Sequence, residues 1–494
     1  EDLGENERQY GFVVANDSNS KRCHDLVHQL QRIGTHNVII TCQNAAKCEF
    51  GFDQFDRVLC DVPCTGDGTI RKNPETGSKW KFFASLNLHD TQKSILLRGL
   101  ELLKKDGICV YSTCSMNPLE DEAVVSEVIS LLGADKVEIV DCSQTYPDLK
   151  RHPGLTKWPE IITAYQRAVK DKEANKLAES NRSNSNQKEE QKDNDNDDNQ
   201  ENKNANENVT EGNAEASTTE NQNEIPIEKN EIIEKGIHTE AQCDGIERCM
   251  RFYPQDHDSG GFFVCVLHKI GDFERKTEPK PAKEIKEAAY HPLLEVSKQS
   301  LDDVFRMYGI HKIDESSSSE DNSLHVNENQ FFVRDEKKVN KVYYISQPIA
   351  DLINKYGSES LHTISAGIQV FNNKAYSKNS PEIPYAAQEG IRVVFKMATQ
   401  RKYALTPDEM KMLLKSGDEG LKLSQLEPER QRIFDNKPRN AALFYIEDSR
   451  FMYTGHLAKF SLKVYLKKEL LRSELDQLIA QFPELADNEN DKDE

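Results

Sequence analysis

The chain has 494 residues, enough for two or three domains. Charged residues make up 30% of it and apolar residues 36%, which is too polar for a single compact globule. Its net charge of −20 argues against nucleic-acid binding by the whole surface, but residues 170–235 alone hold 9 Lys/Arg and 18 Asp/Glu. The acidity is therefore concentrated where no folded domain is expected, which leaves room for a basic groove on a folded part.

Strands and helices alternate over the first 141 residues. GFVVAN (11–16) and FDRVLCD (55–61) are predicted to be buried strands, and the apolar positions of 19–33 recur at helical spacing. Asp106-Gly107 is expected to stop a helix that begins near residue 90. This alternation indicates an α/β fold with a parallel sheet. The expected strands are 11–16, 37–42, 55–61, 108–113 and 137–141, and the expected helices are 19–33, 90–105 and 119–132.

The composition changes sharply after the first domain, which we place at residues 1–169. Between Gln166 and Arg251 there is no Phe, Tyr or Trp, and such a segment cannot bury enough apolar surface to offset the entropy of ordering it. Residues 170–240 are therefore predicted to be a disordered, acidic and Asn-rich insertion. Strand-like sequence resumes over 241–272, which we expect to complete the interrupted sheet.

A separate α+β domain is expected over residues 285–482, before an acidic tail at 483–494. It is rich in short strands such as KVYYIS and HTISAGIQVFNN, and EGIRVVFKMA (389–398) is also strand-like. Its predicted helices lie near 347–355, 406–416 and 462–480.

Polar side chains follow three of the predicted strands directly. In an open parallel sheet, ligands bind beyond the carboxyl ends of the strands. Asp17 is placed to accept both hydroxyl groups of a ribose, and Asn44 to hydrogen-bond an adenine edge. An Asp after a strand is more often a turn former or helix cap, so the pattern of Asp17, Asn44 and Asp61 counts for more than any one of them.

DVPCTGDGT (61–69) and YSTCS (111–115) each place a thiol just beyond a strand. A thiolate is a strong nucleophile, but an ordinary cysteine with a pKa near ~8.5 needs an activating site. Cys60 and Cys109, inside their strands, are best explained as small buried apolar side chains, whereas Cys64 and Cys114 enter polar turns. No CxxC spacing occurs and the other cysteine pairs lack His partners, so no metal site is expected. The eleven cysteines are scattered without a disulfide framework, which indicates a reducing compartment, and no run of about 18 apolar residues predicts a membrane span.

Together these motifs resemble the RNA cytosine-5 methyltransferases of the Sun-domain family. DVPCTGDG with YSTCSMNPLEDEAVV is the specific mark, GFVVANDSNSKR resembles the family's second cofactor motif, and RFYPQDHDSGGFFVCVL resembles its closing hairpin. RKNP after the first cysteine motif is similar to the eukaryotic multisite tRNA branch. The resemblance implies a class I (Rossmann-like) methyltransferase sheet followed by a C-terminal α+β PUA-like RNA-binding domain.

The resemblance also implies a mechanism and its residues. Cys114 is the expected nucleophile on carbon 6 of cytosine, Cys64 assists product release, and Asp61 hydrogen-bonds near ring nitrogen 3. S-adenosyl-L-methionine is the expected cofactor, with contacts carried over to Asp17, Asn44, Asp61 and, more weakly, Arg22. The family usually has Asp where this chain has Asn44, which implies weaker cofactor binding. Nearby Arg71, Lys72, Lys79 and Lys81 suit RNA phosphates, although a solvated loop explains them equally well.

One family motif is missing from the sequence. A strand ending in a Pro-Gly loop, which cradles the methionine part of the cofactor, is expected before GFVVAND and is not found. That strand is central in the family's sheet, so the sheet is expected to be incomplete at its N-terminus. We interpret the chain as a fragment of a longer enzyme rather than an inactive remnant, and predict that alone it binds the cofactor poorly.

Two alternatives stay open. The chain could be a non-catalytic RNA-binding protein that acts through residues 285–480, or a DNA cytosine-5 methyltransferase, in which the roles of Cys64 and Cys114 would be exchanged. The PCTG context and the second thiol favour RNA. The expected partners are tRNA and other RNAs, with no membrane and no metal, and the expected state is a monomer. The resemblance implies the nucleus or nucleolus.

Overall fold

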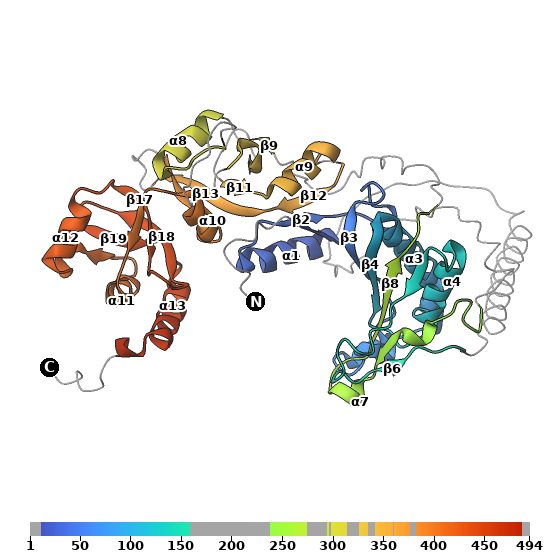
Figure 1. The fold of residues 1–494 in the computed structure, drawn as a ribbon. Helices are drawn as coiled ribbons and strands as arrows, with labels where there is room; N and C mark the ends of the chain where they lie inside the picture. Colours follow the sequence, from blue (N-terminus) through green and yellow to red (C-terminus); the bar gives the residue numbers. More distant parts are fainter. Residues whose placement is uncertain are drawn as a thin grey trace, which may run out of the picture. The chain divides into compact units, whose positions relative to one another are not determined.

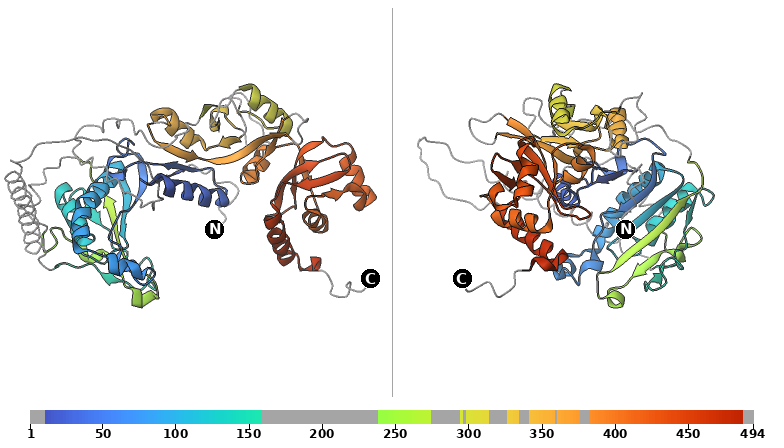
Figure 2. Two further views of the ribbon diagram at one scale, coloured as in Figure 1. Left: turned by 180° about the vertical axis from the view of Figure 1, so that it is seen from behind. Right: turned by 60° about the vertical axis from the view of Figure 1, so that its left-hand side comes forward.

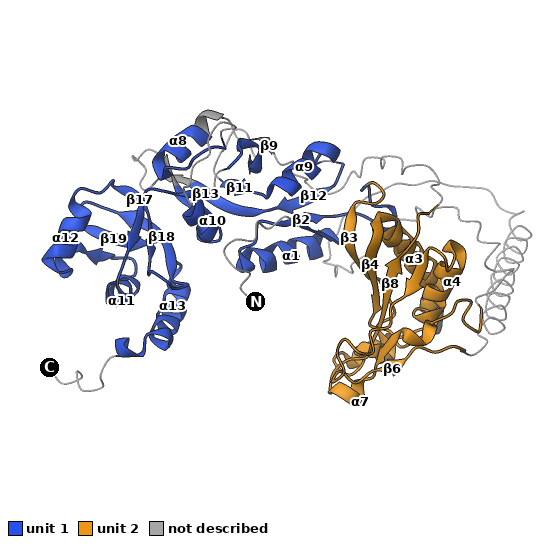
Figure 3. Ribbon diagram, in the orientation of Figure 1, with its two compact units in different colours: residues 1–50, 279–494 blue, residues 51–278 orange. Residues whose placement is uncertain are grey.

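The computed structural model describes residues 11–158, 238–273, 294–295, 298–313, 326–333, 341–358, 360–375 and 382–486. The chain divides into two compact units, the first made of residues 1–50 with 279–494 and the second of residues 51–278 (Figure 3). Most of the insertion predicted to be disordered, and most of the acidic tail, lie outside the described residues. The helices within the described ranges include none long and apolar enough to cross a membrane.

The second unit is built on a six-stranded mixed sheet, in the order β3-β4-β8-β7-β6 with β5 also paired to β8. β3 and β4 are parallel, and β8 lies antiparallel between β4 and β5. Strands from after the insertion therefore join strands from before it, as was expected for 241–272. The elements of this unit are β3 (Phe55–Asp61), α2 (Pro74–Lys79), α3 (Phe82–Leu102), β4 (Leu103–Thr113), α4 (Glu122–Leu132), β5 (Val137–Ile139), β6 (His152–Pro153), β7 (Met250–Phe252), α7 (Pro254–His257) and β8 (Phe262–Lys269).

Helices α3 and α4 lie side by side against one face of this sheet (Figures 1 and 2). Leu96 and Leu100 from α3 and Val124 and Val128 from α4 are fully buried against strand residues such as Cys109. Burying a side chain of this size stabilises the fold by roughly 1.5–3 kcal/mol. This core fixes the two parallel strands whose carboxyl ends carry the cysteine loops.

Helix α3 differs from the helix predicted over 90–105. It begins at Phe82 and ends at Leu102, so Asp106-Gly107 does not stop it. The amides of Asp53 and Gln54 donate to the last carbonyl groups of the helix, at 3.1 and 2.8 Å, and so supply the partners that a helix end needs. Asp106 instead lies inside β4 with a φ of 63°, in a stretch where the pairing with β3 shifts register.

The described residues of the first unit form three sheets, ordered β1-β2-β12, β14-β13-β11-β10-β9 and β15-β17-β18-β19-β16. β1 and β2 are parallel, and β12 adds to β2 antiparallel. The elements are β1 (Val13–Asn16), α1 (Ser20–Ile33), β2 (Val38–Thr41), β9 (Leu294–Glu295), α8 (Lys298–Tyr308), β10 (Phe331–Val333), β11 (Lys341–Tyr344), α9 (Gln347–Tyr356), β12 (Thr363–Ala366), β13 (Ile368–Ala375), β14 (Glu382–Ala386), α10 (Ile391–Met397), β15 (Lys402–Ala404), α11 (Pro407–Ser416), β16 (Leu421–Lys422), α12 (Pro428–Asp435), β17 (Asn440–Tyr445), β18 (Met452–Leu457), β19 (Ser461–Val464) and α13 (Lys468–Gln481).

The described part of the region predicted as one domain over 285–482 forms two five-stranded sheets and also contributes β12 to the sheet of β1 and β2. Each five-stranded sheet has an apolar core, one centred on residues such as Phe331 and Phe371 and the other on residues such as Phe434 and Phe444. The helix expected near 462–480 begins at Lys468, because the residues before it form β19.

Strands form within residues 11–16 and at residues 55–61, but the prediction that these strands are buried is wrong. Both segments are strands, but Val13 is 57% exposed and Leu59 is 68% exposed. Within the described residues, β1 and β3 each pair on one side only and lie at the end of their sheet. An edge strand keeps part of its apolar surface open to solvent.

The prediction of a strand over 389–398 is also wrong, because Ile391–Met397 forms helix α10. Ile391, Val394 and Met397 recur at helical spacing and pack into one core. A Cβ on Gly390, where the helix begins, would lie 2.3 Å from the carbonyl oxygen of Gln369. This close approach to β13, together with burial, overrides the strand preference of the β-branched residues.

Candidate active site

Two parallel strands end side by side in the second unit. The last residue of β3, Asp61, is in register with Ser112 near the end of β4, so the loops that follow are neighbours. These loops carry Cys64 and Cys114, whose sulfur atoms lie 3.2 Å apart. The structure thus brings together the two thiols that the sequence singled out.

The two thiols ionise differently. A hydrogen bond from Cys64 lowers the pKa of Cys114 to about 7, although burial and the Asp61 carboxylate act in the opposite direction. The same hydrogen bond, together with burial, raises the pKa of Cys64. Cys114 is therefore the thiolate of the pair near neutral pH, and Cys64 is its proton-bearing partner.

Gly68 allows the first cysteine loop to pass between two other backbone segments. Its amide donates to the carbonyl oxygen of Cys114 at 3.0 Å, and its carbonyl oxygen accepts from the amide of Gly261 at 2.7 Å. A Cβ at this position would lie 2.6 Å from the oxygen of Gly261 and 2.7 Å from that of Cys114. No other residue fits without moving the loop.

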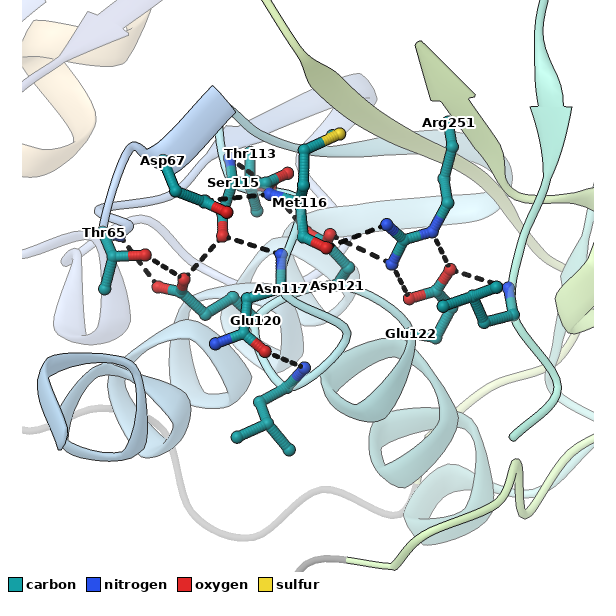
Figure 4. Close-up of polar contacts among 12 residues, drawn as sticks. Thr65, Asp67, Thr113, Ser115, Met116, Asn117, Glu120, Asp121, Glu122 and Arg251 are labelled. Atoms are coloured by element: carbon teal, nitrogen blue, oxygen red, sulfur yellow. Dashed lines mark hydrogen bonds and ion pairs between the residues drawn. The ribbon is translucent and has the colours of Figure 1, made fainter. Parts of the chain in front are cut away.

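Glu120 links both cysteine loops through one buried carboxylate (Figure 4). It accepts hydrogen bonds from the amide and hydroxyl groups of Thr65, at 2.9 and 2.5 Å, and from the hydroxyl group of Ser115 at 2.7 Å. Gln92 donates a further bond at 3.1 Å. Thr65 and Ser115 directly follow the two cysteines, so this carboxylate positions both thiols.

Arg251 pairs with the carboxylates of Asp121 and Glu122, which follow Glu120 in the chain. Its guanidinium group donates to Glu122 at 2.6 and 2.5 Å and approaches Asp121 at 3.3 Å (Figure 4). Arg251 is 2% exposed and both acids are fully buried. Burial raises the pKa of Asp121 well above its ordinary range, and the negative charge of Glu122 raises it further. Arg251 also donates to the carbonyl group of Met116 at 3.0 Å, which connects this cluster to the Cys114 loop.

Asp61 lies at the open end of β3, with its side chain exposed. Its carboxylate accepts one hydrogen bond, from the hydroxyl group of Ser112 at 3.2 Å. A carboxylate has about four acceptor positions, so it has capacity left for a polar ligand beside the cysteines.

The other predicted cofactor residues lie in the first unit. Asp17 follows β1, accepts a hydrogen bond from the amide of Asn19 at 2.8 Å, and forms an ion pair with Arg22 at 3.0 Å. Asn44 follows β2 and accepts from the amide of Ala46 at 3.0 Å, so it caps a short helical turn. These side chains have local partners, as the turn and cap explanation expected, and each keeps polar capacity for a ligand.

A cavity of about 620 Å³ opens beside the first cysteine loop. Trp80, 37% exposed, and three lysine side chains contribute to its wall. Lys79 forms an ion pair with Glu75 at 2.9 Å, and Arg71, outside the lining, pairs with Asp258. The lining residues are Cys64, Thr65, Lys72, Asn73, Pro74, Glu75, Thr76, Lys79, Trp80, Lys81, Ala84 and Leu88.

The sequence did not reveal the buried polar cluster around the thiols. No role was predicted from the sequence for Glu120, Asp121, Glu122 or Arg251. Three consecutive acids just before an apolar run are a weak signal of a buried site. Their partner Arg251 is about 130 positions away in the chain, and only the folded sheet brings it close. Within the described residues, no group of three or more His, Cys, Asp or Glu side chains could hold a metal ion.

Sequence comparison identifies the class of protein. Residues 3–161 match the family described as 16S rRNA methyltransferase RsmB/F, and residues 293–399 match the NSUN2 Pre-PUA domain. Residues 3–161 therefore belong to the methyltransferase fold class, and the second match lies where the predicted C-terminal α+β region begins. These matches agree with the resemblance to the Sun-domain RNA methyltransferases that the cysteine motifs show, over residues 3–161 and 293–399.

Its relatives include eukaryotic tRNA enzymes. The chain is 34% identical over 273 residues to the multisite-specific tRNA:(cytosine-C(5))-methyltransferase of Saccharomyces cerevisiae, covering 53% of this chain and 32% of that protein. It is 28% identical over 511 residues to the tRNA (cytosine(34)-C(5))-methyltransferase of Drosophila melanogaster, covering 93% of this chain and 61% of that protein. The chain thus spans about one third and three fifths of these two relatives. A Pyrococcus horikoshii methyltransferase homologue of known structure is 22% identical, with a TM-score of 0.30 over 52% of this chain and 53% of that one.

Proposed function

We propose that this chain carries the catalytic cysteines of a tRNA cytosine-5 methyltransferase. The observation that supports this most directly is the contact between Cys64 and Cys114, 3.2 Å apart at the ends of neighbouring parallel strands. The relatives named as tRNA (cytosine-C(5))-methyltransferases support the same reaction.

The Cys114 thiolate is the proposed nucleophile. Its sulfur forms a bond to carbon 6 of the target cytosine, and the ring electrons move so that carbon 5 becomes enamine-like. Bound S-adenosyl-L-methionine supplies the methyl group that carbon 5 accepts. A pKa near 7 leaves a large fraction of Cys114 as thiolate at neutral pH, which an ordinary cysteine lacks.

Release requires the Cys114 sulfur to leave again. Removal of the proton from carbon 5 restores the aromatic ring and breaks the sulfur–carbon bond, which returns a thiolate. The Cys64 thiol donates a hydrogen bond to this sulfur and so stabilises it as a leaving group. Asp61, at the end of the adjacent strand, is the residue we propose to hydrogen-bond the cytosine ring near nitrogen 3.

The residues proposed for the cofactor fit its polar groups. Asp17 and Asp61 each have spare carboxylate acceptor positions, which suit hydroxyl or amine donors. The Asn44 oxygen, although it accepts from Ala46, has a second lone pair for an adenine amino group. Arg22 is 74% exposed at its side chain and pairs with Asp17, so we propose that it orients this carboxylate.

The cavity beside Cys64 supports an RNA substrate. Its size lies within the range of ligand sites, and it combines an aromatic face with positive charge. Unpaired RNA bases stack on aromatic side chains while lysines contact the phosphates, so Trp80 with Lys72 and Lys81 suits a nucleotide next to the target base. We further propose that tRNA and other RNAs are the substrates, that the chain is a monomer, and that it acts in the nucleus.

Covalent trapping tests this function. With a tRNA transcript and S-adenosyl-L-methionine, Cys64→Ala should accumulate a protein–RNA adduct that survives denaturing electrophoresis, because the leaving sulfur has lost its hydrogen-bond donor. Cys114→Ala should form no adduct. Cys142→Ala, which also removes a half-buried thiol of the second unit, is the matched control and should behave like the unchanged chain.

The other possible results of the trapping experiment would lead to different conclusions. An adduct with Cys114→Ala and none with Cys64→Ala would exchange the roles of the cysteines, as in a DNA cytosine-5 methyltransferase. RNA binding without an adduct in either variant, in a protein that also binds S-adenosyl-L-methionine, would reject the enzymatic proposal in favour of RNA binding alone.

A further inference from the structure

Two pairs of cysteines connect the β3 and β4 regions, and they differ in environment. Cys60 and Cys109 lie inside the strands with their sulfur atoms 3.9 Å apart, at 5% and 0% exposure. Cys64 and Cys114 lie beyond the strand ends, 3.2 Å apart, and both are only partly buried. Cys64 also lines the cavity of about 620 Å³, so this cavity leads to one thiol of the pair, and the other thiol lies 3.2 Å from it.

The surrounding structure keeps the Cys64–Cys114 pair in contact. Glu120 is hydrogen-bonded to the residue after each cysteine, and the amide of Gly68 ties the first loop to the carbonyl group of Cys114. A disulfide needs a sulfur–sulfur separation of about 2.0 Å, roughly 1 Å less than the present contact. Rotation of the two side chains is a smaller change than the loop movement that separated cysteines would need.

We propose that Cys64 and Cys114 form an oxidative modification site, at which a hydroperoxide converts the two thiols into a disulfide. The Cys114 thiolate attacks the terminal peroxide oxygen, so a sulfur–oxygen bond forms, the oxygen–oxygen bond breaks and an alcohol or water leaves. The Cys64 sulfur then attacks the sulfenic sulfur, and the hydroxyl group departs as water with the proton of Cys64. Two thiols and one hydroperoxide thus give one disulfide, one alcohol or water, and one further water.

Cys60 and Cys109, the pair inside the strands, lie in an environment that opposes oxidation. Cys60 and Cys109 are packed between the sheet and α3, and a Cβ on Gly99 would lie 2.5 Å from the Cys60 sulfur. The hydrogen bond with Cys60 and burial raise the pKa of Cys109 well above its ordinary value. A buried thiol without thiolate character reacts slowly with peroxides. The inference goes beyond the proposed methyl transfer and does not depend on it.

Mass spectrometry of the whole chain tests the proposal. The purified chain is treated with hydrogen peroxide, remaining thiols are alkylated, and non-reduced tryptic peptides are compared with peptides reduced before digestion. Trypsin places Cys60 with Cys64 in peptide 58–71, and Cys109 with Cys114 in peptide 106–136. Either pair would give the same cross-linked mass, so cysteine variants must identify the bond.

The expected cross-link between these peptides persists in Cys60→Ser and in Cys109→Ser and disappears in Cys64→Ser. Its formation rate should rise about tenfold from pH 6 to pH 8, as the thiolate fraction of a group with a pKa near 7 does. A reductant should restore both thiols. A cross-link that survives in Cys64→Ser, or no cross-link in the unchanged chain while Cys114 is oxidised further, would overturn the proposal.

Discussion

At the scale of single residues, the site depends on a difference between two identical side chains. Cys64 and Cys114 share one hydrogen bond that either sulfur could donate, and the lowered pKa of Cys114 with the raised pKa of Cys64 makes Cys64 the donor and Cys114 the anion. Cys114 is next to two carboxylates, Asp61 and Asp67, which oppose its ionisation. The donor thiol therefore outweighs burial and both negative charges, which assigns Cys64 an electrostatic role before any substrate binds.

The reactivity of Cys114 should therefore depend on Cys64. In the unchanged chain, alkylation of Cys114 by iodoacetamide should reach half its maximal rate near pH 7, because only the thiolate reacts and its fraction falls below that pH. In Cys64→Ala the midpoint should move upward, since the hydrogen bond that lowers the pKa is gone. Peptide mapping after timed alkylation measures this. Equal midpoints in the two proteins would contradict the assignment.

Arg251 is predicted to be a stability determinant of the second unit. Arg251→Met removes the only cation that the described residues place on Asp121 and Glu122, and breaking a buried ion pair costs about 3–5 kcal/mol. Urea unfolding followed by tryptophan fluorescence measures this, because both tryptophans, Trp80 and Trp158, lie in the second unit.

The matched control for Arg251 is Arg71→Met. Arg71 also forms an ion pair, with Asp258, but the two side chains are 49% and 87% exposed. Removing an exposed pair should cost less than about 1 kcal/mol. Equal losses in the two variants would show that the buried cluster is not held by Arg251.

At the scale of elements, the contact between the two cysteine loops depends on how closely their backbones approach each other. The loop after β3 crosses between the loop after β4 and the start of β8, and Gly68 lies at the crossing point. Three segments from distant parts of the sequence therefore meet at a position with no space for a side chain. The site is consequently sensitive to changes that leave both cysteines in place.

Gly68→Ala should destabilise the second unit by about 1–3 kcal/mol, the usual cost of inserting a methyl group into packed structure. It should also slow alkylation of Cys114, because the displaced loop carries Cys64 away from it. Gly77→Ala is the control: it lies in α2, its Cβ would meet only side-chain atoms of Ile70 at 3.6–3.8 Å, and alanine favours a helix by about 1 kcal/mol. Urea unfolding and timed alkylation distinguish the variants. Unchanged reactivity of Cys114 in Gly68→Ala would show that the backbone contact at Gly68 does not hold Cys64 against Cys114.

At the scale of the whole molecule, the net charge of −20 and the basic cavity act over different distances. Salt screens charges more than about 10 Å apart, so the net charge of a whole chain does not by itself decide what binds beside a local group of lysines such as those that line the cavity. A polyanion can therefore bind locally to a chain that is acidic overall.

RNA affinity of the chain should accordingly fall as salt rises. Each lysine that contacts a phosphate adds about 0.7 to the slope of log affinity against log salt for single-stranded RNA, so Lys72→Ala with Lys81→Ala should reduce the slope by about 1.4. Lys105→Ala, an exposed lysine of the second unit outside the cavity lining, should leave it unchanged. Fluorescence anisotropy over a salt series measures the slopes, and equal slopes for both sets would exclude the cavity as a phosphate site.

Much of the fold and the thiol pair could be predicted from local patterns. The strands that carry Asp61 and Thr113 have short apolar runs, and polar turns follow them at once. The carboxyl ends of parallel strands meet at one edge of a sheet, and the family resemblance implied that these two strands are neighbours, so the proximity of Cys64 and Cys114 was expected. Where several structures satisfy one pattern, prediction failed: the apolar run 391–397 could form a buried strand or a buried helix, and its packing against β13 decided for the helix.

The sequence by itself thus determined the family, the strands before each cysteine, and the chemistry that two neighbouring thiols allow. Only the tertiary structure decided which thiol is the anion, and that Glu120 and Arg251 organise the loops around it. The physical reason is that hydrogen-bond direction, burial and charge balance depend on distances between residues far apart in the chain. A carboxylate such as Glu120 has the same side chain in solvent and in a core, and its role follows from the donors that the fold places around it.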